Sequence, residues 1–67
     1  MKEINIKDFL VKKRLEKGIT RDKLAFDIGV PVITVAKWEV GESYPDIMLL
    51  PQLATYFSVT IEELLGQ

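Results

Sequence analysis

Apolar residues recur along much of the chain at the three- and four-residue spacing of helices that bury one face. The clearest example lies between Ile19 and Gly41, where a glycine, Gly29, separates two short apolar groups. The residues of the two groups are Leu24, Ala25 and Ile28, followed by Val35 and Trp38. Glycine readily adopts the left-handed conformation that ends many helices, so Gly29 and Gly41 are predicted to close them. The pattern therefore predicts two helices of about two turns each, joined by a tight turn.

The residues that precede these two apolar groups are typical of helix starts. Thr20 can cap the first helix with its hydroxyl, and Asp22 places negative charge in the first turn, where the helix dipole favours it. Pro31 is predicted at the first position of the second helix, where the N–H that proline lacks is not needed. Two short helices that meet at a glycine-containing turn form a helix-turn-helix.

One further helix is predicted before this pair and two after it. Asn5 is expected to cap the first helix and Gly18 to close it. The inward positions of this helix are Ile6, Phe9, Leu10 and Lys13, the last laying its alkyl stem over the core.

The fourth helix is predicted after Asp46, which is a suitable N-cap. Pro51 lies too deep for a regular start at Ile47, so we expect a loose turn over 47–49 and an α-helix from about Leu50, with Pro51 at its first position. The apolar stripe of this helix consists of Leu50, Leu53, Ala54 and Phe57. The fifth helix begins with a capping box, Thr60-Ile61-Glu62-Glu63. Residues 1–67 are thus predicted to form one all-α domain of five short helices.

The composition excludes several kinds of function. The 67-residue chain is 48% hydrophobic, enough for a packed core, and it contains neither cysteine nor histidine. Disulfides and thiolate metal sites are therefore ruled out, and the commonest metal ligand and general base are missing. The carboxylates are scattered over predicted caps and surfaces, and the sequence has no glycine-rich phosphate loop, so we expect no enzyme, metal, cofactor or small-molecule site. No apolar run approaches the roughly 20 residues that span a membrane, which favours a cytoplasmic setting.

The net charge of −1 argues at first against a nucleic-acid partner, but the charges are unevenly distributed. Residues 1–38 contain all nine lysines and arginines and five of the ten acids, a net charge of +4. Residues 39–67 contain the other five acids and no base, a net charge of −5. A domain polarised in this way can turn a cationic face toward phosphates. A chance division of a solvated surface would give the same counts, so charge alone leaves both interpretations open.

The order of the helices and the residues at their ends resemble the lambda-repressor-like (Cro/XRE-type) family. The residues that carry the resemblance are Arg14, Gly18, Leu24-Ala25, Ile28-Gly29-Val30, Lys37-Trp38-Glu39, Gly41, Tyr44-Pro45 and Val59-Thr60-Ile61-Glu62-Glu63-Leu64-Leu65. Each of these residues alone is weak evidence for the family, whereas their combined spacing over residues 6–65 is strong evidence for it. The chain is similar in particular to the N-terminal domain of XRE-type regulators of Gram-positive bacteria, which is often the front of a longer protein. The resemblance implies a sequence-specific transcriptional regulator that binds double-stranded DNA.

The resemblance also implies that residues 31–40 form the recognition helix, which lies in the major groove. The residues it directs toward base edges are Val32, Ile33, Thr34, Ala36 and Lys37. Three of the five are apolar, which departs from the polar residues usual in the family. Lys37 can donate to guanine O6 or N7, whereas Val32 and Ile33 can only make apolar contacts, best with thymine methyl groups. We therefore expect a site with thymine under Val32 and Ile33 and guanine near Lys37.

Two other interpretations of Val32 and Ile33 stay open. They could be buried, although Val35 and Trp38 already define the inward face and Ile33 lies about 200° around the helix from Val35. They could also belong to an exposed patch that binds another protein. Trp38 itself is predicted to be a core residue rather than a platform for base stacking, because Leu24 and Val35 give it apolar neighbours.

Phosphate contacts are implied on both sides of the recognition helix. The first residue of the second helix, usually glutamine in the family, is Arg21 here, and Thr20 lies beside it. Ser43 and Tyr44 occupy the linker on the other side. Glu42 would repel phosphate, which indicates either modest affinity or a phosphate contact that avoids it. For Arg21, the alternative is a solvated surface charge.

The family pairs an arginine late in the first helix with a glutamate late in the recognition helix, which implies a structural ion pair between Arg14 and Glu39. Family members often dimerise near the loop between the fourth and fifth helices, here Phe57, Ser58 and Val59. Alternatively, Phe57 belongs to the core and the domain is a monomer. A protein-interaction module or an antitoxin-like domain that keeps the fold with weak DNA recognition is the second functional hypothesis.

Overall fold

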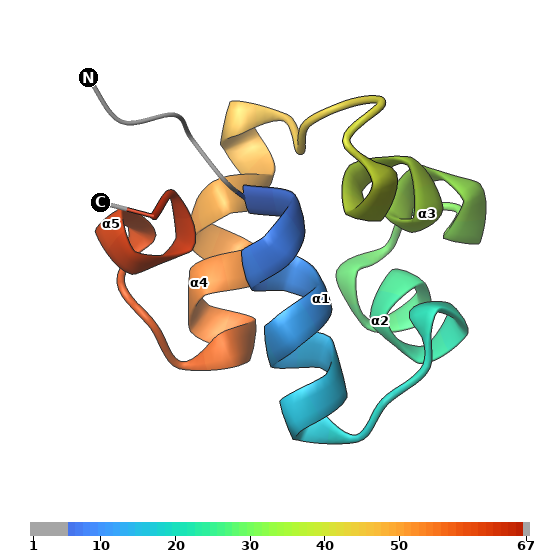
Figure 1. Cartoon of the computed structure of the whole chain (residues 1–67), viewed down its shortest axis with the longest axis horizontal. Coiled ribbons are helices and arrows are strands. Elements are labelled where there is room, and N and C mark those ends of the chain that lie inside the picture. Colours follow the sequence, from blue (N-terminus) through green and yellow to red (C-terminus); the bar gives the residue numbers. More distant parts are fainter. Residues whose placement is uncertain (1–5, 67) are drawn as a thin grey trace.

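A computed structural model of the chain describes residues 6–66, which form five α-helices and one short 3-10 helix (Figure 1). The α-helices are α1 (Ile6–Lys17), α2 (Arg21–Ile28), α3 (Val32–Val40), α4 (Leu50–Phe57) and α5 (Ile61–Leu64), and the 3-10 helix is η1 (Ile47–Leu49). The all-α fold and the order of the elements are as predicted. The expected cap at Asn5 lies outside the described residues.

Helix α1 lies in the middle of the molecule, with α2 and α3 on one side and α4 and α5 on the other (Figure 1). It packs against α3 and α5, while α2 packs against α3 and α4 against α5. Leucines from four helices and a valine from α3 are fully buried where these elements meet. They are Leu10, Leu24, Val35, Leu53 and Leu64, and Trp38 is only 2% exposed. One apolar core therefore joins both sides of α1.

The inward face of α1 differs from the prediction at two positions. Ile6 and Leu10 are buried, but Phe9 and Lys13 are only half-buried. The Lys13 ammonium lies 5.5 Å from the centre of the Phe9 ring and 3.3 Å from Glu16, so both side chains sit at the edge of the core. Arg14 is buried in their place, for a reason given below.

Helix ends follow the capping residues of the sequence. The Thr20 hydroxyl accepts a hydrogen bond from the Lys23 N–H at 3.0 Å, and Gly29 ends α2 in the left-handed conformation with φ +88°. Thr60 and Glu63 form the predicted reciprocal capping box of α5. These caps set where the helices begin and end, and hence which residues α3 can present.

Pro31 and Pro51 each lie one position away from the places predicted for them. Pro31 is the N-cap of α3 rather than its first residue, because its ψ of 147° is extended while its carbonyl already accepts from the Thr34 N–H. Pro51 is the second residue of α4, because Leu50 follows directly from the 3-10 turn over 47–49. Neither shift loses a helical hydrogen bond, since first-turn N–H groups have no partner inside a helix.

Within residues 6–66, no helix is long and apolar enough to cross a bilayer. The same residues bring together no cluster of three side chains suited to hold a metal ion.

Candidate nucleic-acid interface

Helix α3 is anchored by one face and exposed on the other. Val35 and Trp38 point into the core, whereas Val32 is 43% and Ile33 59% exposed. Lys37 is also exposed, and Thr34 and Ala36 are half-buried beside it. The five predicted base-contacting residues thus lie on or at the edge of the outer surface of α3, and the interpretation that Val32 and Ile33 are core residues is wrong.

The turn before α3 is held by backbone hydrogen bonds and by α4. The N–H groups of Gly29 and Val30 both donate to the Ala25 carbonyl, at 2.8 and 3.0 Å. The Gln52 side chain donates to the Ile28 carbonyl at 3.2 Å, which attaches the end of α2 to α4. The start of α3 is therefore fixed relative to the rest of the domain.

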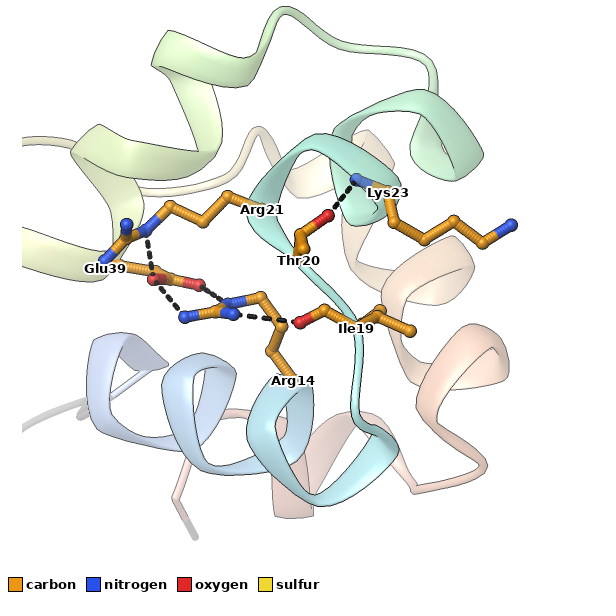
Figure 2. Close-up of polar contacts among 6 residues, drawn as sticks. All are labelled: Arg14, Ile19, Thr20, Arg21, Lys23 and Glu39. Carbon is orange, nitrogen blue, oxygen red and sulfur yellow. Dashed lines mark hydrogen bonds and ion pairs between the residues drawn. The ribbon is translucent and has the colours of Figure 1, made fainter.

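A cluster of charged side chains joins α1, α2 and α3 (Figure 2). Arg14 donates to both Glu39 carboxylate oxygens, from Nε at 2.7 Å and from Nη2 at 3.3 Å. Its Nη1 donates to the Ile19 carbonyl at 2.9 Å. The side chains of Arg14 and Glu39 are 11% and 1% exposed. This pair, which the family resemblance implied, is buried and fully hydrogen-bonded.

Arg21 joins the same cluster, which sequence reasoning missed. Its Nε donates to Glu39 Oε1 at 2.7 Å, and its side chain remains 52% exposed. From the sequence, Arg21 was predicted only as a phosphate contact, with a solvated surface charge as the alternative. One signal was present: by the family resemblance, Arg21 places a charge where a neutral glutamine is usual.

The other predicted phosphate contacts lie on both sides of α3. Thr20 is exposed, and its hydroxyl oxygen is occupied as the cap of α2. Tyr44 is exposed and Ser43 half-buried, while Pro45 directly after them is buried and anchors the linker.

Lys7, in the first turn of α1, brings a cation to this linker. A Cβ atom at Gly41, where φ is +81°, would lie 3.1 Å from Lys7 Cδ and 3.6 Å from Lys7 Nζ. The lysine therefore lies against Gly41, the residue that precedes Glu42. Nothing in the sequence pattern marks this contact, because Lys7 and Gly41 are far apart along the chain.

Residues 10–64 match the sequence profile of the helix-turn-helix family. The chain belongs to this family. It is 39% identical over 57 residues to the HTH-type transcriptional activator BcrR of Enterococcus faecalis, a match that covers 85% of this chain and 28% of the relative. It is also similar to the crystal structure of a transcriptional regulator from Listeria innocua, with a TM-score of 0.93 and 35% identity.

That second match covers 98% of this chain and 62% of the Listeria chain, so the domain spans less than two thirds of either relative. The family and the fold confirm the predicted helix-turn-helix and connect the domain to DNA-binding regulators of transcription.

A polar contact between α2 and α4 also attaches the helix-turn-helix to the rest of the domain. The Tyr56 hydroxyl donates to Asp27 at 2.6 Å, and Lys23 pairs with the same carboxylate at 3.2 Å. The bond from Tyr56 holds the pKa of Asp27 below its ordinary value. Partial burial and the Asp27 carboxylate raise the pKa of Tyr56 to about 12. Lys17 lies over the Tyr56 ring, 5.1 Å from its centre.

The predicted dimerisation segment is only partly accessible. Phe57 is 9% exposed and packs edge-on against Tyr56, with the ring centres 5.1 Å apart. Ser58 is exposed and Val59 half-buried. A contact with a second copy would therefore use Ser58 and Val59, with Phe57 supporting them from the core.

Proposed function

We propose that this helix-turn-helix domain is the DNA-reading part of a transcriptional regulator that acts in the cytoplasm, without catalytic activity. The observation that carries the proposal is the exposure of one face of α3 while Val35 and Trp38 hold its other face in the core. A helix presented in this way fits the major groove of B-form DNA. The similarity to a transcriptional activator and to a transcriptional regulator supports the same function.

In this proposal α3 reads bases largely by apolar contact. Val32 and Ile33 lie against thymine methyl groups, and Lys37 donates to O6 or N7 of a guanine. Thr34 donates or accepts one hydrogen bond, and Ala36 allows close approach. Because only two of these side chains can hydrogen-bond to bases, discrimination depends strongly on thymine.

Phosphate contacts on both sides of α3 position the helix. Thr20 and Arg21 lie at the start of α2, where the free backbone N–H groups also favour an anion. Ser43 and Tyr44 supply the contacts on the opposite side. The cation of Lys7 adds to this group, since it lies beside the linker.

We further propose that two copies bind together through Ser58 and Val59. A two-fold axis between them would place the recognition helices in successive major grooves about 34 Å apart. The bound site would then be a palindrome with half-sites one helical turn apart.

Selection of bound sites from random duplex DNA tests this function. We expect enrichment of a thymine-containing consensus whose affinity falls steeply as salt rises, because phosphate contacts release counterions. In a Lys37→Ala variant, preference at one guanine should relax and affinity should fall by about 1–3 kcal/mol. Lys12→Ala is the matched control, since Lys12 is an exposed lysine of α1 that is not among the proposed contacts. A failure to enrich any sequence at low salt would contradict the proposal.

One observation favours a second candidate function, a protein-interaction or antitoxin-like module. Exposed apolar side chains are not confined to α3, because Phe26 in α2 is 83% exposed. Apolar surface of this kind suits a protein partner. Salt separates the two functions, since binding through apolar contacts would change little over a range that greatly weakens DNA binding.

A further inference from the structure

The buried carboxylate of Glu39 serves two arginines, and the two are used differently. Arg14 donates to Glu39 through Nε and Nη2 and to the Ile19 carbonyl through Nη1 (Figure 2). With a side chain that is only 11% exposed, it is committed to the interior. Arg14 therefore has little capacity left for a ligand.

The Arg21 guanidinium uses only its Nε group in hydrogen bonds within the described part of the domain. It reaches from the first residue of α2 to Glu39, near the end of α3, and donates to Oε1 through Nε (Figure 2). Among residues 6–66, the hydrogen bonds of this side chain involve Nε alone, so the Nη1 and Nη2 groups are left to solvent. A guanidinium held by Nε still presents two N–H donors to an anion in a fixed direction.

The charges of the cluster leave room for such an anion. Two guanidinium groups share one carboxylate, which leaves one positive charge on this side of the domain. Arg21 is the exposed partner, since its side chain is 52% exposed against 11% for Arg14. A DNA phosphate carries the single negative charge that would complete the cluster.

We propose that Glu39 is a positioning residue for DNA binding: it holds the Arg21 guanidinium so that its outer N–H groups meet a backbone phosphate. This inference rests on the proposed function. The arginine is ordered before DNA arrives, so less side-chain freedom is lost on binding. One buried carboxylate thus links the packing of α1 and α3 to a contact on the DNA backbone.

The alternative role of Glu39 predicts the opposite effect of its neutralisation on DNA affinity. If the carboxylate only competes with phosphate for Arg21, neutralising it strengthens DNA binding, because a negative charge near the backbone is removed. If it positions Arg21, neutralising it weakens binding. The Glu39→Gln variant keeps the shape of the side chain but removes its negative charge, and an NH₂ group, which only donates, replaces one of the two oxygens that accept from the arginines.

The test is a double-mutant cycle of Glu39→Gln and Arg21→Ala, with affinity for the selected duplex measured at several salt concentrations. We expect Arg21→Ala to weaken binding about tenfold and to reduce the salt slope by about one. Glu39→Gln should weaken binding about fivefold when Arg21 is present and leave it unchanged when residue 21 is alanine. Circular dichroism confirms that each variant is folded, and Lys12→Gln controls for the loss of an exposed cation outside the proposed contacts.

Equal or tighter binding by Glu39→Gln, or the same loss in both backgrounds, would overturn the inference while leaving the proposed function intact. If Glu39→Gln does not fold, Arg21→Lys decides, because lysine keeps the charge and loses the planar fork. We expect Arg21→Lys to bind about fivefold more weakly than the parent with an unchanged salt slope, and binding equal to that of the parent would overturn the inference. Absence of duplex binding by the parent itself would overturn both proposals.

Discussion

The two sides of α1 are stabilised by different kinds of interaction. Toward α2 and α3, a carboxylate with a 1% exposed side chain holds two arginines. Toward α4 and α5, the packing is carried by buried apolar side chains such as Leu53 and Leu64. A buried charge cluster is stable only while all its members are present, whereas an apolar contact loses stability gradually as side chains are shortened. The side proposed to meet DNA is therefore the one where packing and charge cannot be changed independently.

Loss of Glu39 is expected to have the largest effect. Glu39→Ala leaves Arg14 buried without its carboxylate, and breaking a buried pair from one side costs about 3–5 kcal/mol. The free energy of unfolding can be followed in urea by the fluorescence of Trp38, the single tryptophan. Glu42→Ala is the matched control, because Glu42 is exposed in the following linker. Equal free energies of unfolding for Glu39→Ala and the parent would show that the cluster does not hold the helices together.

Shortening a core leucine on the other side should come next. Leu53 in α4 is fully buried, and Leu53→Ala is expected to cost about 3 kcal/mol by leaving a cavity. Leu15→Ala is the control, since Leu15 is 63% exposed. When measured well below its melting temperature, Leu53→Ala should bind DNA with the salt dependence of the parent. A changed salt slope in this variant would erase the distinction between the two sides.

Sequence patterns predicted the helices and missed part of the charge cluster for a physical reason. Helix faces and caps depend on residues within one or two turns, so the positions of Leu24, Val35 and the Thr60 capping box could be read directly. The role of Arg21 depends on Glu39, which is 18 residues away, and only the crossing of α2 and α3 brings the two side chains together. The contact of Lys7 with Gly41 is hidden for the same reason.

The bond between Tyr56 and Asp27 crosses from one side to the other, and its effect should depend on pH. The folded-state pKa of Asp27 lies below its ordinary value of 3.8, so its contribution to stability is present above that value and is lost as pH falls through the folded-state pKa. The pKa of Tyr56 is raised from 10.0 to about 12, so its contribution is present below pH 10 and is lost as pH rises toward 12.

In the Tyr56→Phe variant, the free energy of unfolding should therefore change less with pH than in the parent, at both acid and alkaline pH. Unfolding in urea at a series of pH values measures this, and the loss relative to the parent should be greatest near neutral pH. Tyr44→Phe is the control, because Tyr44 is 64% exposed. If the free energies of unfolding of Tyr56→Phe and the parent differ by the same amount at every pH, the bond does not connect α2 to α4 in solution.

The smallest expected effect concerns how helices end on the two sides. Helices α2 and α3 end at Gly29 and Gly41, whereas α4 ends at Ser58 in the same left-handed conformation, with φ +58° and ψ +44°. A side chain in this conformation costs roughly 1–2 kcal/mol, which a glycine would avoid. Part of that gain is lost because glycine has greater conformational freedom in the unfolded chain. Ser58→Gly should thus stabilise the domain by about 0.5–1 kcal/mol.

The control for this prediction is Ser43→Gly, because Ser58 is the one non-glycine residue with positive φ within 6–66. Ser43→Gly gains no relief of strain and should be neutral or destabilising. Thermal unfolding of the two variants at several protein concentrations separates the backbone effect from any change in self-association. A gain that appears only at high concentration would mean that residue 58 acts between copies of the chain, which would move its role from the end of α4 to the proposed dimer contact with Val59.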